Sequence, residues 1–238
     1  MKYGISMLAA RGFIGLWAVT VVASGGVSRW AVAAAPYSQT WSGTDTEGWE
    51  GNTTSSQVVH DGTSGNPAGS IVTRRSLSPP VFDIGATSGT VAETSGSFSG
   101  SPWTVSFDLL LDTGKFSGVS LRYRYQGPTF NGWSFPFAGP FDDYNVWKNY
   151  SVTFDPAWTD AQAMAQGWVQ EAGPVESFAT TLADAYRTEI RLIMADDLSA
   201  IAHIDNFVQR AVPEPTGVAL ALLSLAGLGV LRRRTVDI

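Results

Sequence analysis

The chain has 238 residues, of which 44% are hydrophobic, 15% are charged and none is cysteine. The absence of cysteine excludes a disulfide framework and any cysteine-ligated zinc or iron–sulfur site. A formal net charge of −6 argues against a nucleic-acid-binding protein, which needs a basic surface to contact phosphates.

The N-terminus has the layout of a secretory signal peptide. Lys2 and Arg11 form a basic leader, residues 12–27 form an apolar run, and five small residues occupy positions 31–35. The run is shorter than the ~20 apolar residues that a membrane-spanning helix needs, so cleavage is favoured over a retained anchor. We assign residues 1–35 to a signal peptide, with cleavage after Ala33 or a neighbouring residue.

Residues 36–211 are predicted to form one exported domain. Residues 36–212 contain nine Lys or Arg and nineteen Asp or Glu, which gives a net charge of −10. Neither a repeat of fixed period nor a linker that would separate two domains interrupts this stretch.

Alternating apolar and polar residues predict β-strands along this domain, because successive side chains of a strand point to opposite faces. The inward phase of four such strands predicts a core of Phe107, Leu109, Leu121, Tyr123, Val152, Phe154, Ile190 and Leu192. The alternating or β-rich segments are 57–60, 70–73, 103–109, 119–126, 150–154, 190–194 and 200–208.

A helical insertion is expected between residues 155 and 187. Thr159 and Gln162 have the spacing of a capping box, residues 161–166 favour helix, and Gly167 ends it. A second helical turn is expected around Phe178 and Leu182. Many strands, glycine-rich connections and a short helical insertion predict a mainly β fold, an antiparallel two-sheet jelly-roll sandwich.

The second half of the domain resembles a known group of modules. Trp147–Phe154, Trp158-Thr159, Ile190-Arg191 and the final Ile204-Asp205-Asn206-Phe207 follow the order of the laminin IV module and related carbohydrate-binding jelly rolls. The resemblance implies a sandwich fold and sugar binding. Residues 37–101 resemble no family.

The same resemblance implies a structural calcium site, because an aspartate on the last strand of such jelly rolls often completes one. Asp205 matches that position. Asp45 and Glu47 supply carboxylates near the first strand, and Ca²⁺ prefers six to eight oxygen ligands. We therefore predict Asp45, Glu47 and Asp205 as calcium ligands; the alternative is a solvated acidic edge.

Residues 130–141 contain five aromatic residues, two prolines and two glycines, a composition typical of a loop. Sugar C–H faces stack on aromatic rings, so Trp133, Phe135 and Phe137 are predicted glycan-binding residues. The alternative is a lid that folds over one edge of the sandwich.

Residues that would support catalysis are sparse. His60 and His203 are the only histidines, and Phe98 replaces the serine of a nucleophile motif in Gly96–Gly100. Adjacent acids at 142–143 and 196–197 are expected in loops where their side chains diverge, which disfavours the acid–base pair of a glycosidase. The sequence therefore predicts a protein that is not an enzyme.

The C-terminus has three ordered parts. Val212-Pro213-Glu214-Pro215 precede an apolar segment at 216–231, and Arg232-Arg233-Arg234 follow it. Sixteen helical residues rise ~24 Å, so the segment spans a ~30 Å hydrocarbon core by thinning the bilayer or by using its flanks. The arginines would stay cytoplasmic, which places the rest of the chain outside.

This tail resembles the PEP-CTERM sorting signal of exported bacterial proteins. The resemblance implies processing by an exosortase, a membrane protease/transpeptidase, and anchoring in the inner membrane by the C-terminal helix before processing. It also implies release to the cell surface or beyond, in bacteria that make exopolysaccharide.

These features favour an exported, non-catalytic cell-surface or extracellular-matrix protein that is sorted through its tail and has a glycan-binding domain. Two alternatives stay open. One is a secreted glycan-active hydrolase, and the other is an adhesive or ice-surface-binding protein.

We expect replacement of Pro213-Glu214-Pro215 by three alanines to block tail processing, because the sorting family is defined by this motif together with the span and the arginines. Immunoblots of cell fractions should then show a longer product retained in the membrane. Unchanged processing of this variant would contradict the assignment.

If calcium joins the two ends of the domain, thermal melts with excess Ca²⁺ should show a higher midpoint than melts with chelator. A site held at a hundredfold its Kd would stabilise the fold by ~2.7 kcal/mol. The shift should vanish in Asp205→Ala. Equal midpoints in the wild type, or a shift that survives the substitution, would remove the site.

Overall fold

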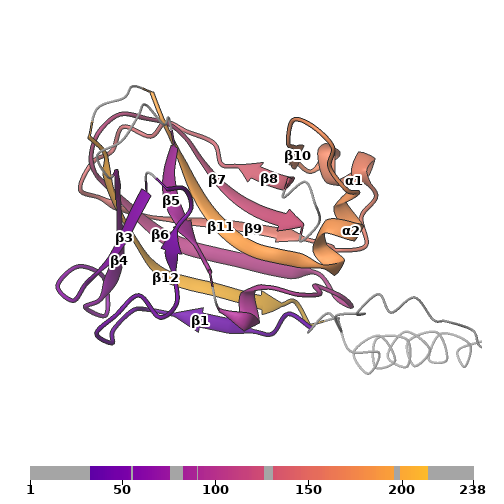
Figure 1. Ribbon diagram of the computed structural model, residues 1–238, viewed down its shortest axis with the longest axis horizontal. Coiled ribbons are helices and arrows are strands. Elements are labelled where there is room, and N and C mark those ends of the chain that lie inside the picture. The colour runs from indigo at the N-terminus through magenta and orange to yellow at the C-terminus, as the bar shows by residue number, and fades with distance from the viewer. Residues whose placement is uncertain are drawn as a thin grey trace, which may run out of the picture. The chain divides into compact units, whose positions relative to one another are not determined.

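Two six-stranded antiparallel β-sheets pack against each other in the computed structural model (Figure 1). The structure describes residues 33–54, 56–75, 83–89, 91–125, 131–195 and 199–213. The predicted mainly β fold with two antiparallel sheets is confirmed. Most of the predicted signal peptide, and the tail from Glu214 to the basic end, lie outside the described residues.

The first sheet is centred on the last strand of the domain, which pairs with strands from three separate parts of the chain. β1 pairs with this strand outside the main strand order. In spatial order the sheet contains β3 (Ser56–Asp61), β4 (Ser70–Arg75), β12 (Ile201–Ala211), β6 (Trp103–Thr113) and β9 (Trp147–Phe154), with β1 (Tyr37–Gln39) beside β12.

The second sheet is centred on two long strands that pair over most of their length. These strands, β7 and β11, have an irregular register at Ala185/Arg187 and at Ile193/Met194. In spatial order the sheet contains β10 (Val169–Gln170), β8 (Gly132–Pro136), β7 (Phe116–Tyr125), β11 (Ala185–Met194), β5 (Asp83–Thr87) and β2 (Glu50–Gly51).

The alternation that predicts the strands also builds the core. Along β6 every odd residue from Trp103 to Leu111 is buried, and the residues between them are half-exposed. Val119, Leu121 and Tyr123 continue the core on β7. All eight predicted core residues are buried, which confirms the inward phase of those four strands: Phe107, Leu109, Leu121, Tyr123, Val152, Phe154, Ile190 and Leu192.

Two short helices interrupt the strands where the sequence predicts an insertion. α1 (Asp160–Ala165) has the predicted capping box: Gln162 N donates to Thr159 Oγ1 at 3.3 Å, and Thr159 N donates to Gln162 Oε1 at 2.8 Å. α2 (Phe178–Ala183) lies with α1 at one end of the sandwich, near β10 (Figure 1). Neither helix of the described part of the chain is long and apolar enough to cross a membrane.

The aromatic segment at 130–141 differs from the expected loop. Gly132–Pro136 form β8, in which Trp133 pairs with Tyr123 and Phe135 pairs with Leu121. Because these partners face the core, β8 turns aromatic side chains inward as well. The glycine and prolines that suggested a loop lie at or beyond the two ends of this short strand.

The two ends of the domain are hydrogen-bonded to the sandwich. Ala34 is buried and its N–H donates to the Ser97 carbonyl at 2.8 Å, and Val212 N donates to the Pro102 carbonyl at 2.7 Å. The η1 turn (Ala92–Thr94) lies beside the first of these contacts, since Ala35 N donates to the Glu93 carbonyl at 3.2 Å.

We expect Leu121→Ala to lower the free energy of unfolding by about 2–5 kcal/mol, because it removes a fully buried side chain from the inter-sheet core. Denaturant unfolding of the purified protein measures this. Thr153→Ala, on an exposed position of β9, serves as the control and should change stability by no more than about 1 kcal/mol, because it removes only an exposed hydrogen bond with Thr104. Equal effects of the two substitutions would contradict the assignment of Leu121 to the core.

Candidate functional site

Charged side chains gather on the second sheet, on the face opposite the core. Leu121 and Tyr123 point into the core, so Arg122 and Arg124, which alternate with them, point to the other face. The register places Glu189 of β11 opposite Arg122. We call this surface the arginine face; its residues are Asn52, Arg122, Arg124, Glu171, Arg187 and Glu189.

Glu189 is the centre of the arginine face. Its side chain is only 1% exposed although it does not face the core. Arg122 Nη1 donates to both carboxylate oxygens at 3.3 Å, and Asn52 Nδ2 donates to Oε1 at 3.1 Å. Arg124 Nε lies 3.2 Å from Oε2. The negative charge of Glu189 is therefore balanced within the face.

Arg122 joins Glu189 to a second acid, Glu171, which follows β10. Its Nη2 donates to Glu171 Oε2 at 2.6 Å and its Nε also contacts this carboxylate. Burial alone would lower the pKa of Arg122, but Glu189 and Glu171 outweigh it and the pKa is raised. Gly132 N donates to Glu171 Oε2 at 2.9 Å. Arg122 is thus a cation held between two carboxylates, although its Nε makes only an ion-pair contact and no hydrogen bond.

Arg124 is less well paired than Arg122. Within the described residues its Nε–Glu189 contact is its only ion pair, and its two Nη atoms donate no hydrogen bond. Burial lowers the pKa of Arg124; Glu189 opposes this shift, whereas Arg122 and Arg187 add to it. Arg187, opposite Arg124 on β11, pairs with Glu50 through Nη1 at 3.2 Å.

Both a hydrogen-bond acceptor and hydrogen-bond donors are unused on this face. Asn52 Oδ1 and Arg187 Nε are buried and have no hydrogen-bond partner among the described residues. The Nη atoms of Arg124 add further free donors. Buried atoms without a partner also occur in the core, at Tyr123 Oη and Trp168 Nε1, so the feature particular to this face is the partly exposed Arg124 with its unpaired Nη atoms.

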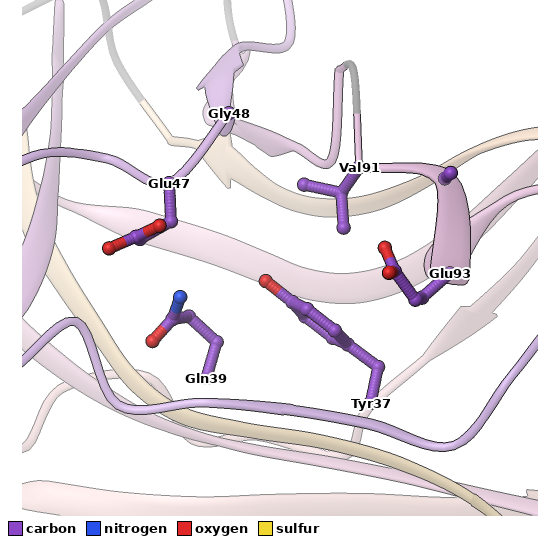
Figure 2. A pocket seen from close by; sticks show the side chains of 7 residues that line it. Tyr37, Gln39, Glu47, Gly48, Val91 and Glu93 are labelled. Atoms are coloured by element: carbon purple, nitrogen blue, oxygen red, sulfur yellow. The ribbon is translucent and has the colours of Figure 1, made fainter.

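A second open feature is a groove of about 440 Å³ between β1 and the η1 turn. Figure 2 shows the Tyr37 side chain between those of Glu47 and Glu93, with Gln39 and Val91 nearby. Burial raises the pKa of Tyr37, and the neighbouring Trp49 and Gln39 side chains oppose this shift. This Tyr37 groove combines an aromatic ring with polar side chains.

The predicted calcium ligands lie in separate settings. Asp45 Oδ1 accepts a hydrogen bond from Glu47 N at 2.8 Å, and both side chains are exposed. Asp205 is buried on β12 and accepts from Asn66 N at 3.0 Å and Asn206 N at 2.7 Å. The described part of the chain holds no group of three or more His, Asp or Glu residues suited to a metal ion. This geometry does not support the calcium clasp, which stays a prediction.

Asp205 has an acidic neighbour that the sequence did not indicate. Asn206 Nδ2 donates to Asp108 Oδ2 at 2.8 Å and to Asp205 Oδ2 at 3.3 Å, so one amide lies between two carboxylates. Burial raises the pKa of Asp205, the hydrogen bonds from Asn66 and Asn206 oppose the shift, and Asp108 adds to it.

The predicted glycan-binding aromatics belong to the packing of the sandwich. Trp133 is fully buried, packs on Phe178 at a ring distance of 5.4 Å and donates from Nε1 to the Glu176 carbonyl at 3.0 Å. Trp133 therefore offers no ring face to a sugar. Phe135 and Phe137 are half-buried 5.3 Å apart, and Phe137 lies 5.6 Å from Phe107. Trp133 and Phe135 lie on the strand β8 of the second sheet, so they form neither the expected loop nor a lid. Sugar binding by Phe135 and Phe137 stays a prediction.

The two histidines make no contact typical of a serine hydrolase. His60 Nε2 lies 2.9 Å from the Trp41 carbonyl oxygen, and His203 Nδ1 lies 3.5 Å from Asp61 Oδ2. Among the described residues no serine hydroxyl is hydrogen-bonded to either ring. Asp143 pairs with Lys148 at the surface, while Asp196 and Asp197 lie outside the described residues.

Comparison with known proteins relates this chain to others by fold. No protein-family model matches the sequence, and no curated protein matches it. The structure superposes on an exo-β-agarase with a TM-score of 0.52 and 9% identity, over 74% of this chain and 25% of the agarase chain. The chain thus corresponds to about a quarter of that enzyme's length, and the likeness shows the fold alone.

Carbohydrate-binding modules are also similar to this β-sandwich. The CBM22-1 xylan-binding domain of Paenibacillus barcinonensis Xyn10C has a TM-score of 0.44 and 12% identity, over 77% of this chain and 99% of that domain. The family 11 module of Clostridium thermocellum Lic26A-Cel5E has a TM-score of 0.46 and 12% identity, over 78% of this chain and 99% of that module.

Proposed function

We propose that this protein is an exported, non-catalytic cell-surface or matrix protein whose β-sandwich binds a polysaccharide on the arginine face. The observation that carries the proposal is the partly exposed side chain of Arg124, whose Nη atoms donate no hydrogen bond among the described residues; Asn52 Oδ1 and Arg187 Nε beside it also lack partners but are buried. A sugar hydroxyl both donates and accepts, so neighbouring hydroxyls of one sugar ring satisfy both kinds of group.

The acids of the face support binding rather than hydrolysis. A glycosidase needs one carboxyl that gives up a proton and a second that acts as nucleophile or base. Glu171 and Glu189 both pair with Arg122, and Glu189 also contacts Arg124. Both carboxyls are thus committed to ion pairs with arginine inside the protein.

The export part of the proposal rests on the sequence. The basic leader and small residues before Pro36 favour a signal peptide. Val212-Pro213-Glu214-Pro215 and Arg232-Arg233-Arg234 favour handling by an exosortase. On this proposal the chain is membrane-anchored before processing and then reaches the cell surface or the extracellular polysaccharide, its proposed partner.

Pull-down of the purified protein on the extracellular polysaccharide of the producing cell tests the function. We expect saturable binding without release of reducing ends. Asn52→Leu, which removes the free acceptor at similar volume, should weaken binding about tenfold, because a buried unmade hydrogen bond costs about 1–3 kcal/mol. Thr153→Ala on β9 of the other sheet should bind like the wild type.

A third variant, Tyr37→Ala, separates the arginine face from the Tyr37 groove. Loss of binding in Tyr37→Ala with normal binding in Asn52→Leu would move the site to the groove and contradict the proposed location. Release of reducing ends would favour the hydrolase alternative. Thermal melts of each variant show whether a loss of binding reflects a loss of fold.

A further inference from the structure

Two arginines lie opposite each other on neighbouring strands of the arginine face. Arg187 of β11 is in register with Arg124 of β7. Like charges in directly opposed cross-strand positions destabilise a sheet. Arg122 next to them is held by two carboxylates, whereas Arg124 has a share in only one, that of Glu189. The positive charge of Arg124 is the least compensated on the face.

The guanidinium of Arg124 is also accessible. Its side chain is 24% exposed, and its Nη atoms have no acceptor among the described residues. Its register partner on the other side is Gly132 of β8, which has no side chain to cover it. A Cβ at Gly132 would lie 1.8 Å from the Tyr123 carbonyl oxygen, so the close approach of the two backbones requires glycine there.

Arg187 is held in a fixed orientation beside Arg124. Its guanidinium carbon lies 4.6 Å from the centre of the Tyr186 ring, and Nη2 donates to the Tyr186 hydroxyl at 3.0 Å. Tyr186 and Arg187 are neighbours in the chain, and they lie where the register of β11 shifts, between Ala185 and Arg187. The Nε of Arg187 has no partner but is buried, so a ligand reaches this side chain, which is 24% exposed, through its Nη atoms.

We propose that the polysaccharide bound by the arginine face is acidic, and that the carboxylate of a uronic acid residue binds Arg124 and Arg187. The inference rests on the proposed function and names the chemical class of its ligand. A planar guanidinium presents a fork of donors that matches the two oxygens of a carboxylate. A carboxylate at this position also relieves the repulsion between the opposed arginines.

The test uses two forms of one polymer that differ only in charge. Polygalacturonate carries a carboxylate on every residue, and its fully methyl-esterified form carries none. We expect the protein to bind polygalacturonate at least tenfold more tightly than the methyl ester in affinity electrophoresis. Raising NaCl from 50 to 500 mM should weaken only the first interaction, because salt screens accessible charges.

Arg124→Gln keeps hydrogen-bonding groups at this position but removes the charge. It should lower the affinity for polygalacturonate at least about tenfold and leave binding of the methyl ester within twofold, since hydrogen bonds between charged groups are stronger than those between neutral groups. Arg187→Gln should act in the same direction. Arg210→Gln, an exposed arginine on β12 of the other sheet, is the matched control and should keep the preference.

The outcomes separate this inference from the proposed function. Equal binding of both polymers, or a preference for polygalacturonate that survives in Arg124→Gln, overturns the inference. Binding of a neutral polysaccharide alone that is lost in Asn52→Leu overturns the inference and leaves the proposed function standing. Binding of neither these polymers nor the cell's own polysaccharide overturns both. Thermal melts of Arg124→Gln and Arg187→Gln distinguish lost contacts from lost fold.

Discussion

The burial of one carboxylate governs the candidate site. Glu189 is 1% exposed on a sheet face that lies away from the core, and an unpaired buried charge would be prohibitively unfavourable. Removal of one partner from a buried ion pair typically costs about 3–5 kcal/mol. Arg122 and Asn52 are therefore held in place by Glu189, and Arg122 in turn holds Glu171. The groups that remain unused around this network are the ones that we propose to meet a ligand.

Stability alone does not explain the network. Apolar residues of similar volume that pack well are often as stabilising as a buried ion pair, or more so. The arginine face also leaves Asn52 Oδ1 without a partner and opposes Arg124 to Arg187, and both features disfavour the folded state. Local rules of folding are broken most often at functional sites. The arginine face breaks two such rules, one at Asn52 and one at the opposed arginines, around the fixed Glu189. Such a face is suited to recognition.

The sequence predicts the core strands well because burial on one side imposes alternation. Segments 103–109 and 190–194 follow this rule, and their inward apolar residues, such as Phe107, Ile190 and Leu192, are buried. Gly132–Pro136 was expected to be a loop, since glycine, proline and clustered aromatics are common there. Its pairing with β7 overrides this local tendency. Strand β5 has the sequence Asp-Ile-Gly-Ala-Thr. It lacks alternation because it is buried along almost its whole length.

The arginine face was not predictable, because the alternation that identifies a strand assigns its polar residues to an ordinary solvent-exposed face. Arg122 and Arg124 occupy the polar phase of a strand, where charged residues usually face water. What distinguishes Arg122 is its partner Glu189, 67 residues further along the chain, and that pairing is set by the register between β7 and β11. Asn52 and Glu171 reach the same place from turns beside β2 and β10. Local sequence patterns contain no information on such contacts.

The net charge of the domain and the charge of its arginine face have opposite effects on an acidic ligand. The charge of −10 over residues 36–212 slows the approach of a polyanion, because long-range repulsion acts on the encounter rate. That repulsion is screened beyond about 8 Å at physiological ionic strength, whereas the guanidinium groups act at contact distance. The arrangement of charge on the arginine face therefore determines which ligand stays bound, and the net charge of the domain determines how fast the ligand arrives. A matrix protein among abundant, slowly diffusing polymer chains needs selective retention more than rapid capture.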